Sequence, residues 1–307
     1  DEASGANFIP EDILQDVEGN IWINTEGKGI VQLVSEHISY LNKDQGLASD
    51  LILSFVEDEK SMWFITYGEG INRWVDNRFE RYNTTTSITN NTLWCSIKTH
   101  DGSIWFGSSD GVSRFLNNSF ENYTLSNFFN GRKVVAQSFF EDKNKVLWIG
   151  TKKGLFSFNN NKFQLKNQFI KKIRSITSFG EDKLLLGTDK GVLVYNKLND
   201  SFIPLSDKLN EVTVFTIAKN GNILYFATDE GLYTFSKGIL HKQTVSSNLK
   251  NDETLNFVFV DSRQSVWVGT TSAGVFIKRK EDSVYRQYTV NEGLVGMETN
   301  MNAIYED

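Results

Sequence analysis

Short apolar runs alternate with polar turns along the whole chain. Leu51 to Val56 reads LILSFV and Thr254 to Val260 reads TLNFVFV, and both runs are rich in residues that favour strands. No stretch shows the three-to-four spacing of an amphipathic helix. Turn dipeptides such as Asp101-Gly102 and Asn220-Gly221 tolerate the positive φ angles of tight hairpins. The pattern therefore predicts an all-β protein of short strands joined by hairpins.

These runs recur as a unit of about forty residues. Each unit has an apolar run, a polar turn, a second apolar run, a turn bearing Gly, a third apolar run and a more polar fourth stretch. The second run carries Trp22, Trp63, Trp105, Trp148 or Trp267, with Leu185 and Tyr225 in two other units, and the next turns carry Gly29, Gly70, Gly111, Gly154, Gly191, Gly231 and Gly274. Seven such units predict a seven-bladed β-propeller of four-stranded antiparallel blades.

The repeat also predicts the boundaries of the ring. We expect one propeller over residues 1–307, with blades at about 8–48, 49–89, 90–131, 132–170, 171–209, 210–251 and 252–296. The C-terminal YTVNEGLVGMETNMNAIYED repeats the lead-in to the second unit, so 297–307 is either the first strand of a further repeat or a strand that closes the ring. Either alternative indicates a ring taken from a longer protein.

Steric and packing arguments assign the recurring residues to the scaffold. A large indole ring buries about 150–250 Å², so we expect each Trp to pack one blade against the next. We expect each Gly at the start of the third strand, where φ is positive or a side chain would clash. The pairs Glu57-Asp58, Glu141-Asp142 and Glu306-Asp307 end the first strand of their units, and we interpret them as turn caps.

One form of the unit, FFEDKNKVLWIGTKKGLFSF at Phe139 to Phe158, resembles the two-component regulator propeller repeat. The resemblance covers essentially the whole chain, although Leu185 and Tyr225 depart from its Trp position. It implies a periplasmic sensor region of a membrane-anchored bacterial regulator, in which propellers precede an immunoglobulin-like domain, a membrane helix and a kinase or cyclase. It also implies an oligosaccharide or another small ligand as input, with a neighbouring propeller or immunoglobulin-like domain and a second copy as partners.

Composition narrows the function classes further. The net charge is −6 with basic residues scattered, which argues against nucleic acid as a partner. The single Cys95 excludes an internal disulfide, and we expect it to be buried. His37, His100 and His241 lack paired metal-ligand spacing, so we expect no metal, no cofactor and no catalytic residue. A cell-envelope assembly propeller and a metal-dependent lyase or hydrolase remain the alternatives to a sensor.

Propeller geometry predicts where a ligand would bind. The turns between second and third strands and the loops after fourth strands should open on one face, at the mouth of the central channel. Their residues differ from unit to unit, as expected of binding loops on a fixed scaffold. The candidates are Tyr67, Glu69, Asp110, Phe128, Phe129, Arg132, Lys152, Asp189 and Asp229. Among them, Tyr67, Phe128 and Phe129 suit stacking against sugars, and Arg132 suits bidentate hydrogen bonds.

Overall fold

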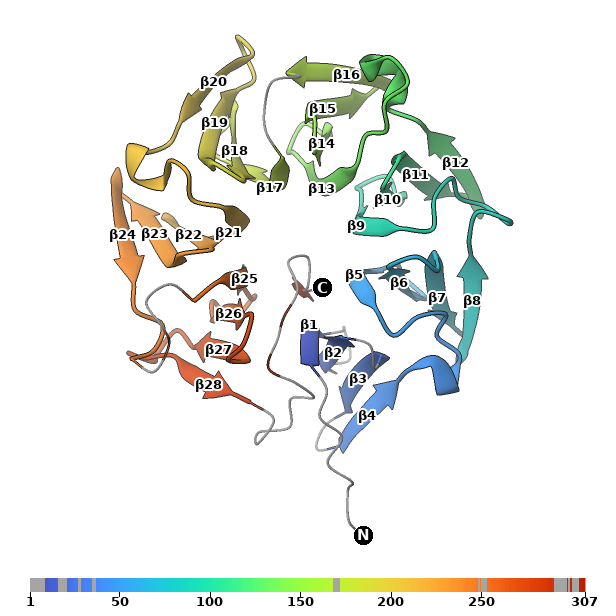
Figure 1. Cartoon of the computed structure of the whole chain (residues 1–307), viewed down its shortest axis with the longest axis horizontal. Helices are drawn as coiled ribbons and strands as arrows, with labels where there is room; N and C mark the ends of the chain where they lie inside the picture. The colour runs from blue at the N-terminus through green and yellow to red at the C-terminus, as the bar shows by residue number, and fades with distance from the viewer. Residues whose placement is uncertain are drawn as a thin grey trace.

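The computed structural model describes residues 9–15, 21–26, 29–34, 37–167, 172–247, 249, 253–289, 297, 299 and 304–306. For 9–41 and 304–306 it describes the backbone alone. The described part is all-β apart from three short 3₁₀ turns: η1 (Lys43–Gln45), η2 (Ser126–Phe129) and η3 (Asp207–Leu209). Its sheets are arranged around a central opening, as Figure 1 shows, so the predicted β-propeller architecture is confirmed.

Six sheets are four-stranded antiparallel blades, each formed by four consecutive strands. The first three consist of β5 (Ile52–Glu57), β6 (Met62–Thr66), β7 (Ile71–Val75) and β8 (Arg78–Tyr82); β9 (Leu93–Lys98), β10 (Ile104–Ser108), β11 (Gly111–Leu116) and β12 (Ser119–Tyr123); and β13 (Ala136–Glu141), β14 (Leu147–Thr151), β15 (Gly154–Asn159) and β16 (Lys162–Asn167).

The other three blades follow the same plan. They consist of β17 (Ile173–Ser178), β18 (Lys183–Thr188), β19 (Gly191–Asn196) and β20 (Ser201–Pro204); β21 (Val214–Asn220), β22 (Ile223–Thr228), β23 (Gly231–Ser236) and β24 (Ile239–Gln243); and β25 (Leu255–Val260), β26 (Val266–Thr270), β27 (Val275–Lys278) and β28 (Arg286–Tyr288). In every blade the first strand lies nearest the opening (Figure 1).

The remaining sheet differs from these blades. It holds five strands in the order β29-β1-β2-β3-β4, from β1 (Ile9–Gln15), β2 (Ile21–Glu26), β3 (Gly29–Val34), β4 (His37–Leu41) and β29 (Ile304–Glu306). Strand β29 pairs in parallel with β1, with Ile13 opposite Ile304. The prediction of seven four-stranded antiparallel blades is therefore wrong: the structure has six. The cause is the C-terminal strand, which adds a parallel partner to β1. The residue bounds of the individual repeats stay a prediction.

Aromatic side chains fill the space between neighbouring blades. Trp63 on β6 is fully buried, with its ring 5.6 Å from Phe106 and 4.7 Å from Phe115 of the next blade. Trp105 and Trp148 repeat this arrangement, 4.7 Å from Phe158 and 5.4 Å from Tyr195. Trp267 on β26 is half-buried. The side chain of Trp22 lies outside the described residues. The indoles therefore contribute to a core that runs from blade to blade.

The recurring glycines stand where a side chain cannot. Gly70 has φ +87°, and a Cβ there would lie 2.2 Å from the carbonyl oxygen of Tyr82 on β8. Gly111 has φ +100° and the same 2.2 Å approach to Tyr123. The φ angle is also positive at Gly154, Gly191, Gly231 and Gly274, whereas for Gly29 the structure gives only its place at the start of β3. Glycine therefore allows the turn between the second and third strands to lie close to the fourth strand.

The aspartates that follow the first strands hydrogen-bond both to the backbone of the turn and to a buried indole. Asp58 and Asp142 each accept a hydrogen bond from a backbone N–H two residues on, at 2.9 Å, which is the capping contact that the sequence indicates. The second carboxylate oxygen accepts from an indole N–H: Trp63 to Asp58 at 2.9 Å and Trp148 to Asp142 at 3.0 Å. These two aspartates thus satisfy the indole N–H groups of Trp63 and Trp148. Cys95 is buried, as predicted.

Candidate functional site

The two kinds of loop expected to share a face do contact each other. Gly70 N–H donates to the carbonyl of Asn91 at 3.0 Å, and Gly111 N–H donates to that of Val134 at 2.9 Å. Gly191 makes the same contact with Val212 at 2.7 Å. In each pair the glycine ends the turn between a second and a third strand, and its acceptor belongs to the loop that leads to the next first strand. The face that carries these loops is therefore the candidate binding face.

Every first strand carries a β-bulge at the same place. Pairing of the first strand with the second skips one residue in all six blades, and also at Glu11 between β1 and β2. The skipped residues in the blades are Leu53, Trp94, Gln137, Arg174, Phe215 and Asn256. A bulge re-aims a side chain and is common beside functional sites. The bulge therefore recurs in every blade, whereas the side chain at the bulge differs from blade to blade.

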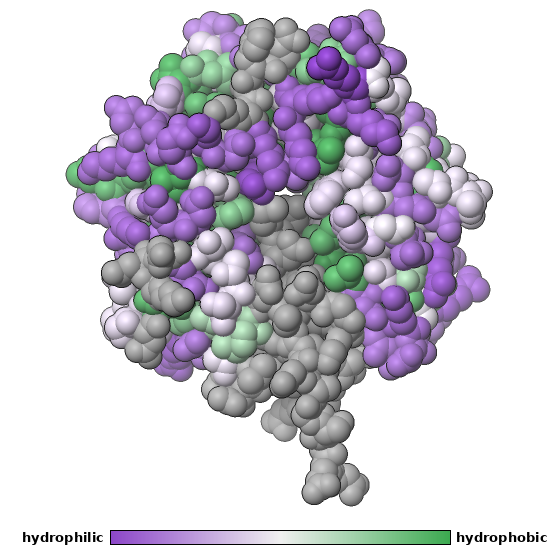
Figure 2. All heavy atoms as spheres, in the orientation of Figure 1, coloured by the Kyte–Doolittle hydropathy of each residue, from purple (hydrophilic) through white to green (hydrophobic). Residues whose placement is uncertain are grey.

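A second set of residues stands next to these bulges. The turn residues Tyr67, Ser109, Lys152, Asp189, Asp229 and Thr271 donate backbone N–H groups to the carbonyls of Leu51, Thr92, Val135, Lys172, Thr213 and Thr254. Each acceptor lies two residues before a bulge. In each blade a turn residue therefore lies close to the bulge residue. We call these two sets together the mouth ring. Figure 2 shows hydrophilic residues gathered at the edge of the opening over β13, β17 and β21.

Aromatic groups occupy one side of the mouth ring. The rings of Tyr67 and Trp94 meet edge to face at 5.8 Å, although they come from neighbouring blades. Tyr67 remains 50 % exposed. The Lys152 ammonium lies 5.5 Å from the centre of the Trp94 ring, and the indole N–H donates to Ser109 Oγ at 2.9 Å. This fixes the indole between two polar groups and leaves a mixed aromatic and cationic surface.

Charged groups occupy the adjoining side. The guanidinium of Arg174 lies 5.0 Å from the Phe215 ring, and the carboxylates of Asp189 and Asp229 act on it. Burial, then the positive charges of Arg174 and Lys152, lower the pKa of Lys172 to about 8, while Asp189 opposes this with the smallest effect. The cations around Lys172 therefore outweigh the one carboxylate acting on it.

Buried polar atoms in this region have no hydrogen-bond partner among the described residues. They include Oε1 of Gln137, Oδ1 of Asp110 and Oδ1 of Asp189. Gln137 is only 5 % exposed. Buried acceptors are normally satisfied, so water or the hydroxyl groups of a ligand are the expected donors.

The structure brings together some of the predicted site residues. Tyr67, Lys152, Asp189 and Asp229 belong to the mouth ring, and Asp110 follows Ser109 in the same turn. Glu69 is exposed in the turn after Tyr67.

Phe128, Phe129 and Arg132 lie apart from the mouth ring. Phe128 and Phe129 in η2 pack against Phe156, 5.2 and 6.1 Å between ring centres. The side chain of Arg132 is exposed and makes no hydrogen bond or ion pair with the described residues. Phe128 and Phe129 therefore pack against the third strand of the next blade, and none of the three residues belongs to the mouth ring.

Sequence reasoning missed the bulge residues altogether. A signal was present, because the second position of each first strand varies from Leu to Trp, Gln, Arg, Phe and Asn while the positions beside it stay apolar or small. Trp94, between Leu93 and Cys95, is an example.

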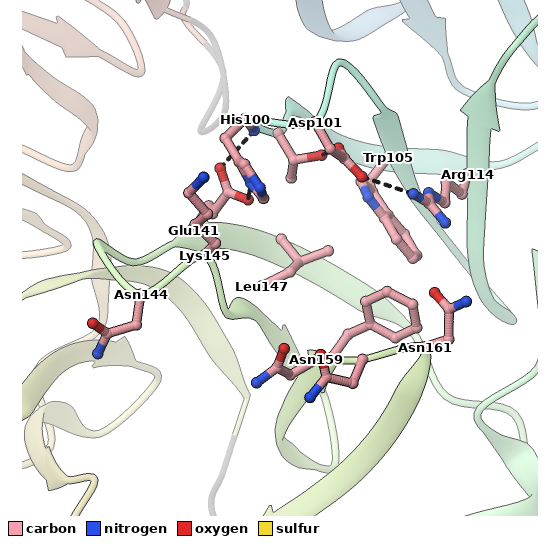
Figure 3. Close-up of a pocket in the computed structure, with 13 residues that line it drawn as sticks. His100, Asp101, Trp105, Arg114, Glu141, Asn144, Lys145, Leu147, Asn159 and Asn161 are labelled. Carbon is pink, nitrogen blue, oxygen red and sulfur yellow. Dashed lines mark hydrogen bonds and ion pairs between the residues drawn. The ribbon is translucent and has the colours of Figure 1, made fainter.

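A separate pocket lies at the opposite ends of the strands (Figure 3), between the β9–β12 and β13–β16 blades. Its volume is about 370 Å³, with Trp105, Leu147 and Phe158 on its apolar side. His100 Nδ1 contacts Glu141 Oε1 at 2.6 Å, and Arg114 contacts Asp101 at 2.7 Å. Both carboxylates are therefore already paired, Glu141 across two blades and Asp101 within one.

The ion pair between Asp101 and Arg114 makes part of the folding stability depend on pH. Burial raises the pKa of Asp101, but hydrogen bonds from Thr99 and Ser103 and the charge of Arg114 outweigh it and set the pKa at about 2. Stability from this group is present above the unfolded pKa of about 3.9 and is lost as pH falls towards 2. We expect Asp101→Asn to flatten the fall of melting temperature between pH 4 and 2. An unchanged slope in thermal melts of the two proteins would contradict this.

Within the ranges given above, no group of three or more His, Cys, Asp or Glu side chains could hold a metal ion. No helix in the described part of the chain is long and apolar enough to cross a membrane.

Comparison with known proteins places this fold. No family model matches the sequence, and no curated protein matches it either. The extracellular domain of the putative hybrid two-component system BT4673 from B. thetaiotaomicron matches 97 % of this chain over 61 % of its own length, with 16 % identity and a TM-score of 0.50. This chain therefore shares the fold of part of that extracellular domain.

Two other propellers show how widely the fold is shared. Virginiamycin B lyase from Staphylococcus aureus matches 87 % of this chain and 93 % of its own, with 12 % identity and a TM-score of 0.69. PorZ, a surface component of the type-IX secretion system of Porphyromonas gingivalis, matches 91 % of this chain and 48 % of its own, with 13 % identity and a TM-score of 0.62. At such identities these likenesses establish the fold alone.

Proposed function

We propose that this chain is a non-enzymatic sensor propeller in the extracytoplasmic, periplasmic part of a membrane-anchored bacterial signal-transduction protein. Its input is an oligosaccharide, bound at the mouth ring. The observation that carries the proposal is the bulge at one place in all six blades, bearing a different side chain each time. A repeated backbone device with variable side chains is what a recognition surface on a fixed scaffold requires.

The chemistry of the ring fits a saccharide. Trp94, Tyr67 and Phe215 offer ring faces or edges for the apolar sides of pyranose units. Gln137 and Asn256 offer amides, and the unpartnered Gln137 oxygen would accept from a sugar hydroxyl. The repeat resemblance supports a sensor in preference to an assembly factor or an enzyme, and the match to the BT4673 domain over 97 % of the chain is compatible with that choice.

A thermal-shift and calorimetric screen against an oligosaccharide panel tests this proposal. We expect one glycan to raise the melting temperature, and Trp94→Ala to weaken its binding by about tenfold or more, since a buried aromatic contact is worth about 1–2 kcal/mol. Phe128→Ala is the matched control, because Phe128 is 41 % exposed on the same face but lies outside the mouth ring. Equal losses in both variants, or no binding to any glycan, would refute the proposal.

A further inference from the structure

Lys172 lies where two neighbouring blades meet, because Ser138 Oγ on β13 donates to the carbonyl of the next residue, Ile173, at 3.4 Å. Its backbone carbonyl accepts the N–H of Asp189, and it lies two residues before the Arg174 bulge. The charges of Arg174 and Lys152 act on it more strongly than that of Asp189. Arg174 is compensated differently, because both Asp189 and Asp229 act on it. Among the described residues, the cations that act on Lys172 therefore outweigh the carboxylate, and Lys152 extends this positive charge to the Trp94 side of Arg174.

An anion is the group that would balance this charge. We infer that the oligosaccharide is acidic and that its carboxylate or sulfate lies between the ammonium groups of Lys152 and Lys172, with the adjoining sugar unit against Trp94. The inference rests on the proposed function and names the class of its ligand. Lys152 connects the position of the anion with that of the adjoining sugar unit, because its ammonium lies 5.5 Å from the Trp94 ring. A neutral glycan would leave the repulsion between the two cations unbalanced in a partly buried site.

Ligand binding would then be coupled to protonation. The pKa of Lys172 is about 8 in the free protein, so roughly half of the protein lacks this charge at pH 8. An anion favours the charged form and raises the pKa, so binding at pH 8 takes up as much as about half a proton per ligand. The uptake vanishes in Lys172→Gln. Calorimetry at pH 8 in buffers of different ionisation enthalpy measures it.

Two pairs of probes separate charge from sugar shape. Trigalacturonate is compared with its fully methyl-esterified form, and a sulfated carrageenan tetrasaccharide with its desulfated form. We expect the charged member of at least one pair to bind about tenfold more tightly than its neutral partner. Lys152→Gln and Lys172→Gln should each remove most of that difference. Lys153→Gln should leave binding within about twofold, because the Lys153 ammonium lies by Phe129, 5.3 Å from its ring.

The outcomes distinguish this inference from the proposed function. If neither charged probe binds more tightly than its neutral partner, or if Lys153→Gln weakens binding as much as Lys152→Gln, the inference is overturned. A neutral glycan whose binding depends on Trp94 would overturn it while leaving the sensor proposal in place. Melting temperatures equal to that of the wild type would show that the three lysine variants are folded.

Discussion

Gly70→Ala should destabilise the fold by about 3 kcal/mol or more. A Cβ at this position would lie 2.2 Å from the backbone carbonyl oxygen of Tyr82, so the strand or the turn would have to move. Overpacking of this kind costs about 1–3 kcal/mol, and a side chain at positive φ adds about 1–2 kcal/mol. Denaturant unfolding of wild type and variant measures the difference.

Gly68 supplies the control for this prediction. It lies in the same turn with φ +93°, but a Cβ there would meet nothing within 4 Å. Gly68→Ala should therefore cost only the backbone term of about 1–2 kcal/mol. If the two variants were equally stable, the close approach of the turn to β8 would not be the reason for the recurring Gly.

Asp142→Ala should cost about 3 kcal/mol, because one buried carboxylate joins two blades. Its side chain is 4 % exposed and accepts hydrogen bonds from the Trp148 indole at 3.0 Å and from Lys197, in the next blade, at 2.9 Å. The variant leaves Lys197, only 13 % exposed, without its partner, and breaking such a pair typically costs about 3–5 kcal/mol. Chemical unfolding at pH 7 measures the loss.

Glu181→Ala is the matched control for the inter-blade ion pair. Glu181 pairs with Lys143, also across blades, but the two side chains are 81 % and 54 % exposed. Solvent screens a pair this exposed, so the variant should remain close to the wild type in stability. Equal effects of Asp142→Ala and Glu181→Ala would show that burial of the Asp142 carboxylate is unimportant.

The repeat made the blade interior predictable from the sequence. Trp63 and Gly70 occupy the second strand and the start of the third because each answers a local requirement, one for apolar area and the other for positive φ. The turn-capping role of Asp142 was also readable, since it depends on a backbone N–H two residues away. Its bonds to Trp148 and Lys197 were not, because they join residues six and 55 positions distant.

Neither the number of four-stranded antiparallel blades nor the position of the bulges could be predicted from the sequence, because both depend on how the strands pair. Residues 304–306 carry an ordinary strand pattern, and only their contact with β1 makes the fifth strand parallel. Likewise, nothing in the alternation around Trp94 shows that β10 skips it, because register is a property of two strands and not of one. The candidate site rests on those bulges, so the sequence pointed to some residues of the mouth ring and missed the others.

A glycan-binding measurement on three proteins tests the mouth ring most directly. Wild type, Trp94→Ala and Asn159→Ala are screened on the same oligosaccharide array, Asn159 being a residue of the pocket at the opposite ends of the strands. We expect at least one oligosaccharide to bind the wild type. Its binding should be lost in Trp94→Ala and retained in Asn159→Ala. Binding that survives Trp94→Ala but is lost in Asn159→Ala would contradict this expectation.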